Sequence, residues 1–296
     1  MKLHGSMCAI VTPFASNKID LSALERLVTF QIENGTSALI PCGTTGESAT
    51  LSHAEHHEMI EQTVNFVGER VPVIAGTGSN STAEAISLTR EAKKWGADAA
   101  LLITPYYNKP TQEGLYAHYM AVADAVDIPQ ILYNVPARTA VSIKPETVAR
   151  LADHPNIVAI KEASGDLDYV SQLRGLTDLQ ILSGNDNLNL SFMGLGASGS
   201  ISVLANVVPG MCSQMMTAAT HNDWETARAV HFKTFSLIEA LFVETNPIPV
   251  KYALHLMGMI SDEIRLPMTP LAEQHRARLQ RELSALGLLN KSGAIA

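Results

Sequence analysis

Short apolar runs alternate with amphipathic stretches along most of this chain, and this alternation restricts its fold more than any other feature. Each run is continuously apolar, as expected for a strand that is buried on both faces of a parallel sheet. Eight runs occur, at residues 7–11, 38–41, 71–75, 99–104, 129–134, 157–160, 180–182 and 200–204. Because right-handed crossovers join parallel strands, this order predicts an α/β fold, a closed (β/α)8 TIM barrel.

The stretches between the runs carry signals for the ends of helices. A serine lies three residues before a glutamate in segments 22–25, 52–55 and 81–84, which is the pattern of a reciprocal capping box. Gly35 and Gly96 are placed to end the first and third of these helices. We therefore predict a capped helix after each of the first three barrel strands.

The C-terminal part of the chain has a different pattern. After Pro209 no strand-like run follows, and helical patterns occupy residues 224–244, 249–259 and 271–286. We therefore expect a catalytic barrel over residues 1–222 and a C-terminal helical domain over residues 223–296.

An open, doubly wound sheet would share the alternation of strands and helices. Residues Gly194–Gly199 even match a GxGxxG pattern. That fingerprint should follow a strand and begin a helix, whereas here a helical segment precedes it and a strand follows. The sequence therefore favours the barrel over a dinucleotide-binding sheet.

Composition excludes several classes of protein. The 296 residues contain 21 basic and 29 acidic side chains, so the net charge of −8 disfavours nucleic-acid binding. No segment has the pattern of an export signal or reaches the roughly 20 apolar residues of a membrane span. Three widely spaced cysteines suggest no disulfide framework. We expect a cytoplasmic protein, and its low charged fraction of 17% hints at oligomerisation.

Reactive side chains cluster where the predicted strands end, and in such barrels these ends form the active site. Lys161 follows a buried-looking strand, where burial can provide a neutral amine for Schiff-base chemistry. A lysine that reaches out to water is the alternative. Lys251 lies in the helical extension, and we interpret it as structural. Tyr133 could transfer a proton, or it could be an ordinary packed tyrosine.

Other polar groups allow more than one interpretation. Gly43 and Gly46 could bring backbone N–H groups close to a carboxylate, although a tight turn alone would look similar. Arg138 could hold a second carboxylate with its planar guanidinium, or it could be a solvated loop residue. The cluster at residues 53–57 could hold a metal, but it lacks HExxH, and we expect no metal site. Asp186 disfavours phosphorylated substrates.

Four motifs together resemble the dihydrodipicolinate synthase family of pyruvate-dependent class I aldolases, within the N-acetylneuraminate lyase superfamily. They are Gly-Thr-Thr-Gly-Glu at 43–47, Tyr-Tyr-Asn-Lys-Pro at 106–110, Tyr-Asn-Val-Pro-Ala-Arg at 133–138 and Ile-Lys-Glu-Ala-Ser at 160–164. The resemblance implies that pyruvate forms a Schiff base with Lys161 and condenses with L-aspartate 4-semialdehyde. This reaction is the first committed step of the diaminopimelate route to lysine, and it needs no cofactor.

The resemblance also implies roles for individual residues. Tyr133, Thr44 and Tyr107 would form a proton relay, with Tyr107 provided by a neighbouring subunit. The family is usually a homotetramer, a dimer of dimers. Substrate-binding residues would be Thr45, Arg138, Gly184 and Ile201.

A regulatory site is implied in the same way. L-Lysine would act as an allosteric inhibitor in a pocket formed by Ser48, Ala49, His53, His56, Asn80, Glu84 and Tyr106. The chain departs from many members at Asn185, where an aspartate is common. Asn185 belongs to neither the relay nor this pocket.

Two alternatives remain open at this stage. A sialic-acid or keto-deoxy-sugar aldolase would share the lysine and tyrosine, although Arg138 favours a small carboxylated aldehyde. A barrel that only binds or senses amino acids belongs to a different functional class. The presence of both Lys161 and Tyr133 argues against it.

Overall fold

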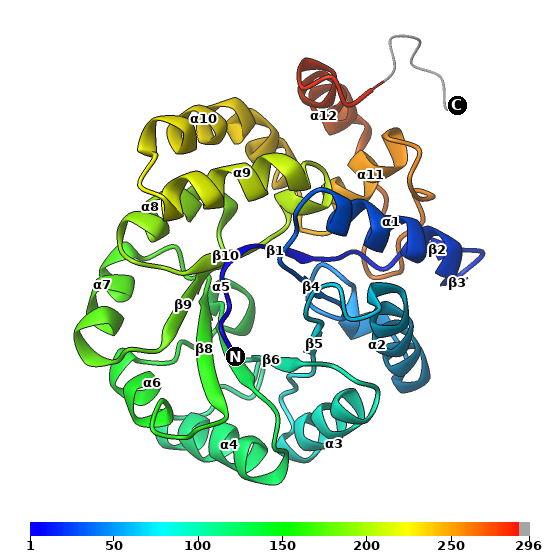
Figure 1. The fold of residues 1–296 in the computed structure, drawn as a ribbon. Coiled ribbons are helices and arrows are strands. Elements are labelled where there is room, and N and C mark those ends of the chain that lie inside the picture. The colour runs from blue at the N-terminus through cyan, green and yellow to red at the C-terminus, as the bar shows by residue number, and fades with distance from the viewer. Residues whose placement is uncertain (290–296) are drawn as a thin grey trace.

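Eight parallel strands form a closed ring in the computed structural model, which describes residues 1–289 (Figure 1). Consecutive strands of the ring lie side by side and the last strand pairs with the first, while the second and third are joined where Leu39 N donates to Pro72 O over 3.0 Å. The strands are β1 (Gly5–Ala9), β4 (Ala38–Ile40), β5 (Ile74–Gly76), β6 (Ala99–Ile103), β7 (Gln130–Asn134), β8 (Ile157–Glu162), β9 (Gln180–Ser183) and β10 (Gly199–Ser202). The predicted barrel is confirmed.

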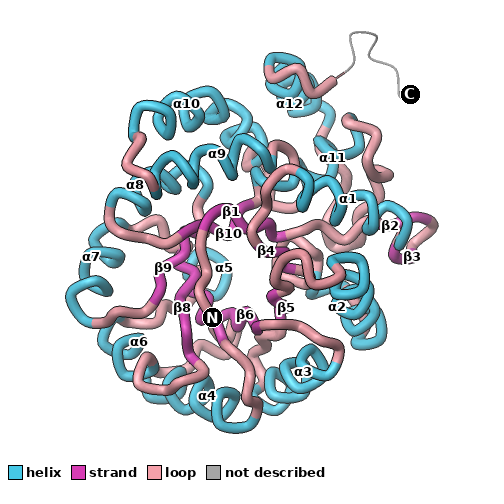
Figure 2. Tube along the Cα trace, in the orientation of Figure 1, coloured by secondary structure: helices cyan, strands magenta, loops and turns pink. Residues whose placement is uncertain are grey.

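Helices surround this ring on the outside (Figure 2). They are α1 (Leu21–Glu33), α2 (His53–Val67), α3 (Thr82–Lys94), α4 (Gln112–Ala125), α6 (Pro145–Leu151), α7 (Leu167–Leu176), α8 (Asn189–Gly194) and α9 (Pro209–Thr220). The sequence did not reveal the small elements, which are the hairpin β2 (Phe14–Ala15) and β3 (Lys18–Ile19), the helix α5 (Pro136–Thr139) and the 3-10 turns η1 (Ser48–Thr50), η2 (Asp186–Leu188) and η3 (Leu204–Asn206).

The three predicted capping boxes have different outcomes. Ser52 and Glu55 form the complete reciprocal box at α2. The prediction at α1 is wrong, because Asp20 is the N-cap and accepts a hydrogen bond from the Ala23 N–H. An aspartate one residue before the helix reaches this N–H directly. At α3 Ser81 caps the helix, but the carboxylate of Glu84 turns away from it.

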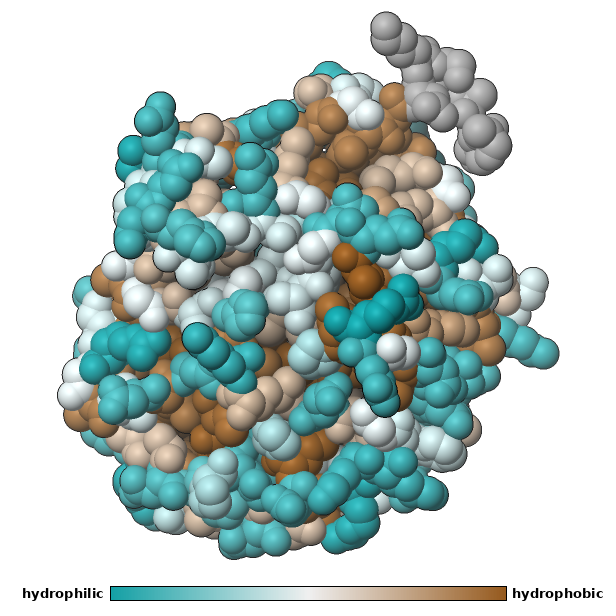
Figure 3. All heavy atoms as spheres, in the orientation of Figure 1, coloured by the Kyte–Doolittle hydropathy of each residue, from teal (hydrophilic) through white to brown (hydrophobic). Residues whose placement is uncertain are grey.

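The strands contribute side chains to two layers of the core. We call the residues that fill the ring the inner layer: Met7, Ala9, Ala38, Ile40, Ile74, Ala99, Leu101, Ile131, Tyr133, Ala159, Leu182 and Ile201. The outer layer lies between strands and helices, and includes Leu102, Leu132 and Ile160. The ring is therefore a packed core. The space-filling view shows no open channel through this face of the molecule (Figure 3).

The expected C-terminal helices are present as α10 (Trp224–Leu241), α11 (Ile248–Leu256) and α12 (Glu273–Ala285). α10 packs on the barrel helix α9, and α12 packs on α10 and α11. The division into a barrel over residues 1–222 and a helical domain over residues 223–296 stays a prediction. Residues 290–296 of that predicted domain lie outside the described residues. Among residues 1–289, no helix is long and apolar enough to cross a membrane.

Candidate active site

Lys161 and Tyr133 lie side by side at the carboxyl end of the barrel. They are register partners on β8 and β7, and the Lys161 Nζ lies 4.2 Å from the centroid of the Tyr133 ring. Both residues are 7% exposed. Within the described chain no carboxylate lies within ion-pair distance of this amine. A buried amine without a counter-charge is suited to react as a nucleophile.

Gly184 follows β9 and passes close to this lysine. A Cβ at position 184 would lie 2.9 Å from Cε of Lys161 and 2.7 Å from Cβ of Ala163. Any residue larger than glycine at position 184 would therefore displace the side chain of Lys161. Ile201, on β10, belongs to the inner layer. The structure thus places these two of the four predicted substrate-binding residues on a barrel strand or just beyond one.

The turn at residues 43–47 is held from the C-terminal helices. The buried Lys251 donates to Oε1 of Glu47 over 2.5 Å, and Asn246 Nδ2 donates to Oγ1 of Thr45 over 3.0 Å. Glu47 needs this support because it adopts a left-handed conformation, with φ of 53°. We predicted a structural Lys251 but missed its partner Glu47, and we missed the contact of Asn246.

One cavity of about 490 Å³ opens at this end of the barrel. Thr44, Tyr133 and Arg138 line one part of it. Arg138 lies on the short helix α5, and its Nη2 donates to the backbone oxygen of Asn246 over 3.3 Å. We call this part the reaction chamber. It combines a hydroxyl, a phenol and a guanidinium, which can bind and protonate a carboxylated carbonyl compound.

The second part of the cavity contains most of the predicted regulatory residues. Lining residues here include Ser48, Ala49, His53, His56, Glu84 and Tyr106, and we call this part the effector chamber. The predicted Asn80 is not in its lining, but its backbone oxygen accepts a hydrogen bond from Asn108 Nδ2 over 2.9 Å.

Charge in the effector chamber comes mainly from Glu84. Its Oε1 lies 3.1 Å from His53 Nε2, and its Oε2 accepts from the Ser79 hydroxyl. These hydrogen bonds lower the pKa of Glu84. Burial lowers the pKa of His56, whose Nε2 lies 2.8 Å from the Gly76 carbonyl. The chamber therefore combines an ionised carboxylate with a neutral imidazole, a combination suited to an ammonium group.

Tyr107 lies away from the other relay residues. Its side chain is 89% exposed, and its backbone is left-handed with φ of 73°. Across residues 1–289, no hydrogen bond links it to Thr44 or Tyr133. The predicted relay is therefore not assembled within one chain.

Other polar groups have structural partners. Asp186 is buried and accepts hydrogen bonds from the backbone N–H groups of Val203 and Leu204, each over 2.9 Å. It thereby joins the loop after β9 to the loop after β10. In the described part of the chain, no group of three or more His, Cys, Asp or Glu side chains is arranged to hold a metal.

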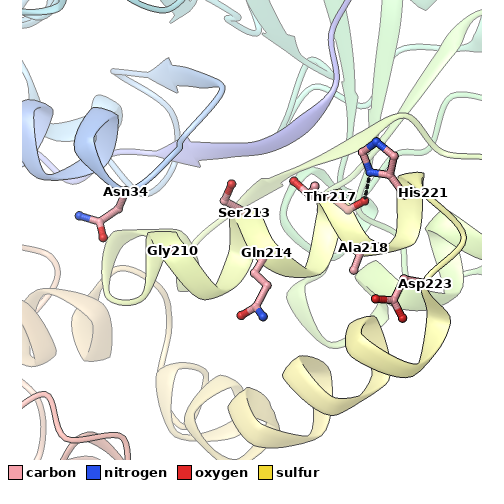
Figure 4. Close-up of a pocket in the computed structure, with 8 residues that line it drawn as sticks. All are labelled: Asn34, Gly210, Ser213, Gln214, Thr217, Ala218, His221 and Asp223. Atoms are coloured by element: carbon pink, nitrogen blue, oxygen red, sulfur yellow. Dashed lines mark hydrogen bonds between the residues drawn. The ribbon is translucent and has the colours of Figure 1, made fainter.

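A second hollow lies outside the barrel along α9 (Figure 4). Its polar groups already serve helix ends, because Asp223 caps α10 through Thr226 N and His221 Nδ1 contacts the Thr217 carbonyl. Lys161 lines neither this hollow nor the barrel cavity, but Tyr133, whose ring lies against the Lys161 amine, lines the barrel cavity. We therefore locate the active site in the reaction chamber.

A family model named the dihydrodipicolinate synthetase family matches residues 2–286. The chain belongs to this family. A relative from Geobacter sulfurreducens, 4-hydroxy-tetrahydrodipicolinate synthase, is 57% identical over 277 residues, which cover 93% of this chain and 96% of the relative. The predicted family and the predicted lyase activity are thus confirmed.

Solved structures of family members agree with this fold. Dihydrodipicolinate synthase from Acinetobacter baumannii, complexed with pyruvate, is 49% identical with a TM-score of 0.95, and the match covers 97% of this chain and all of that one. The enzyme from Cyanidioschyzon merolae, with lysine bound, is 41% identical with a TM-score of 0.94, covering 97% and 99%.

Proposed function

We propose that this protein condenses pyruvate with L-aspartate 4-semialdehyde through a Schiff base on Lys161, as a 4-hydroxy-tetrahydrodipicolinate synthase. The observation that carries the proposal is the buried amine of Lys161, which lies against Tyr133 and faces no carboxylate in the described chain. Family membership and the relative solved with pyruvate support it.

The reaction begins when the Lys161 amine attacks the ketone carbon of pyruvate. Loss of water leaves a protonated imine, which withdraws electrons and allows the methyl group to lose a proton. The resulting enamine forms a carbon–carbon bond to the aldehyde of the second substrate. The amino group of that substrate then attacks the imine carbon, closes the ring and releases Lys161.

Proton transfer in these steps falls to Tyr133, Thr44 and Tyr107. A phenol beside the forming carbinolamine can both donate and accept a proton. Thr45, Gly184 and Ile201 would bind pyruvate, and Arg138 would hold the carboxylate of the aldehyde. The exposure of Tyr107 supports its donation to a second copy of the chain, within a homotetramer.

Borohydride trapping tests the central step. With pyruvate present, borohydride should reduce the imine and leave a permanent mass increase on Lys161. Lys161→Ala should remove both the label and the condensation activity, whereas the exposed Lys233→Ala should retain both. If the parent protein remained unlabelled at position 161, the proposed mechanism would be wrong.

We further propose that L-lysine inhibits the enzyme by binding in the effector chamber. The ionised Glu84 and the neutral His56 support this, and so does the relative with lysine bound. Millimolar lysine should therefore reduce turnover. Unchanged turnover would refute the regulatory proposal while leaving the catalytic one intact.

A sugar-acid aldolase is the second candidate, because it would use the same lysine and tyrosine. Turnover of aspartate semialdehyde should exceed that of sialic acid or keto-deoxy-sugar acids, since Arg138 suits a short carboxylated aldehyde.

The three cysteines are free and buried, which is compatible with the proposed cytoplasmic location.

A further inference from the structure

Strand β8 departs from regular pairing three residues before the reactive lysine. Gln130 on β7 pairs with Ile157, but the next residue, Ile131, pairs with Ala159. Val158 is therefore an extra residue without a partner on β7, and β8 contains a bulge at this point.

The bulge determines which way Lys161 points. Ile157 packs in the outer layer, whereas Val158 and Ala159 both face the inner layer in succession. Alternation then resumes, with Ile160 in the outer layer and Lys161 facing inward. If the same residues alternated regularly from Ile157, with no bulge at Val158, Lys161 would face out of the barrel, because a shift of one residue exchanges the two faces of a strand.

The register pair that follows Tyr133 and Lys161 is joined by a hydrogen bond between its side chains. Asn134 and Glu162 are register partners, and Asn134 Nδ2 donates to Oε2 of Glu162 over 2.7 Å. Oε1 of Glu162 accepts from the Ser164 N–H. Oδ1 of Asn134 accepts from the Ile143 N–H over 3.1 Å and from the Ser142 hydroxyl over 3.2 Å. We call this arrangement the Asn134–Glu162 bridge.

Burial makes the bridge specific for one register. Asn134 and Glu162 are fully buried, and burial raises the pKa of Glu162. A shift of β8 by one residue would move the carboxyl into the inner layer and leave the amide without a partner. A buried polar group without a partner costs about 1–3 kcal/mol, so the shifted register is disfavoured.

We propose that the Asn134–Glu162 bridge fixes the register of β8 beyond its bulge, so that Lys161 faces Tyr133 inside the barrel. Asn134 and Glu162 are therefore positioning residues, which act through the lysine and touch no substrate. The inference rests on the proposed function, because it assumes that Lys161 carries the reaction.

Two single substitutions break the bridge with little change of shape. Asn134→Asp replaces the donating amide by a second carboxyl, so the pair can bond only if one of the two carboxyls holds a proton. Glu162→Gln cannot satisfy both neighbours: if its oxygen accepts from Asn134, its NH2 group faces the Ser164 N–H, donor against donor.

Together, the two substitutions restore every hydrogen bond with one direction reversed. In the double variant, the new glutamine NH2 donates to the new aspartate, and the glutamine oxygen accepts from the Ser164 N–H. The other aspartate oxygen accepts from Ile143 and Ser142. Total charge is unchanged, because one carboxyl replaces another.

The measurement is the rate at which borohydride traps pyruvate on Lys161, together with kcat, the KM for pyruvate and Tm. Each single variant should slow trapping and kcat by roughly tenfold to a hundredfold, since misplacement by about 1 Å can cost that much. The double variant should return to within about threefold of the parent. Gln31→Leu, on α1 and away from both strands, is the control: it removes a buried amide that donates to the Ala205 carbonyl, so it should lower Tm while leaving the trapping rate near that of the parent.

The outcomes separate this inference from the proposed function. Single variants that lose Tm but trap pyruvate at the parent rate would overturn the positioning role, and so would a double variant as slow as the singles. A parent protein that traps no pyruvate would overturn the proposed function, and the positioning role with it.

Discussion

Two lysines of the described chain are buried, and their partners give them different chemistry. Lys251 forms an ion pair with Glu47, so its ammonium is neutralised by a fixed carboxylate. Lys161 faces the ring of Tyr133 instead. The same residue type therefore supports the structure at one position and is free to react at the other.

Arg138 should control the second substrate and leave the first unaffected. Arg138→Lys removes the planar fork that binds a carboxylate through two hydrogen bonds. We expect the KM for aspartate semialdehyde to rise about tenfold or more, with little change in borohydride trapping of pyruvate. Steady-state kinetics with each substrate varied will test this, and an equal rise in both KM values would contradict it.

Glu84 should determine sensitivity to lysine. Glu84→Gln removes the charge that would pair with the ammonium group of the effector, so the concentration for half-inhibition should rise at least about tenfold. The exposed Glu58→Gln, on α2, is the control and should retain the parent sensitivity. Inhibition curves normalised to the rate without lysine will compare them.

At the level of elements, the C-terminal helices hold the turn that begins the active site. The segment between α10 and α11 provides Asn246 to Thr45, and α11 provides Lys251 to Glu47. Arg265, beyond α11, adds an ion pair to Glu55 on α2. The C-terminal helices therefore hold the 43–47 turn and α2 from outside the ring.

Removing the Lys251 side chain should destabilise the contact between α11 and the 43–47 turn. Lys251→Met leaves the carboxylate of Glu47 buried and unpaired, which should destabilise the protein by about 3–5 kcal/mol. Denaturant unfolding will measure the loss. Adding Glu47→Gln should recover part of it, since no charge then remains unpaired. An additive loss in the double variant would show that the ion pair is not the cause.

The ion pair between Glu55 and Arg265 should make the stability of the protein depend on pH in the acidic range. Hydrogen bonds from Arg265 lower the pKa of Glu55 from 4.5 to about 2. A carboxyl with a lower pKa in the folded state stabilises it above the unfolded pKa, and this contribution disappears as pH falls from about 4.5 towards 2. Glu55→Gln should lower Tm at pH 7, and its difference from the parent should vanish near pH 2.

At the level of the whole molecule, one cavity contains both the reaction chamber and the effector chamber. Tyr106 lines the effector chamber, and the adjacent Tyr107 extends away from the chain. A bound effector is thus one residue from the proposed relay. This adjacency leads to the hypothesis that effector binding at Tyr106 is coupled to the relay through Tyr107. The inhibition measurements above address it.

A shared relay predicts complementation between inactive subunits. Lys161→Ala and Tyr107→Phe should each be nearly inactive alone. Mixed and reassembled, they should regain a fraction of the parent rate, because one copy can supply its intact tyrosine to the intact lysine of another. Light scattering should show a tetramer, and a monomer with full activity would contradict the shared relay.

Local patterns in the sequence were sufficient to predict the order of the elements and the reactive groups. Apolar runs located all eight barrel strands, because strands that are buried on both faces are made mostly of apolar residues. Lys161 and Tyr133 could be identified because each lies at the end of such a run. The N-cap of α1 was missed, since Asp20 and Ser22 could both cap the helix and only the backbone geometry distinguishes them.

Only the tertiary structure revealed the bulge at Val158, the bridge between Asn134 and Glu162, and the support of the 43–47 turn. Strand register is a relation between two segments, so a single strand cannot show where an extra residue falls. Lys251 and Glu47 are 204 positions apart. Partners so distant are chosen by the packing of the whole barrel, whereas the apolar period that forms a strand is already present in its own residues.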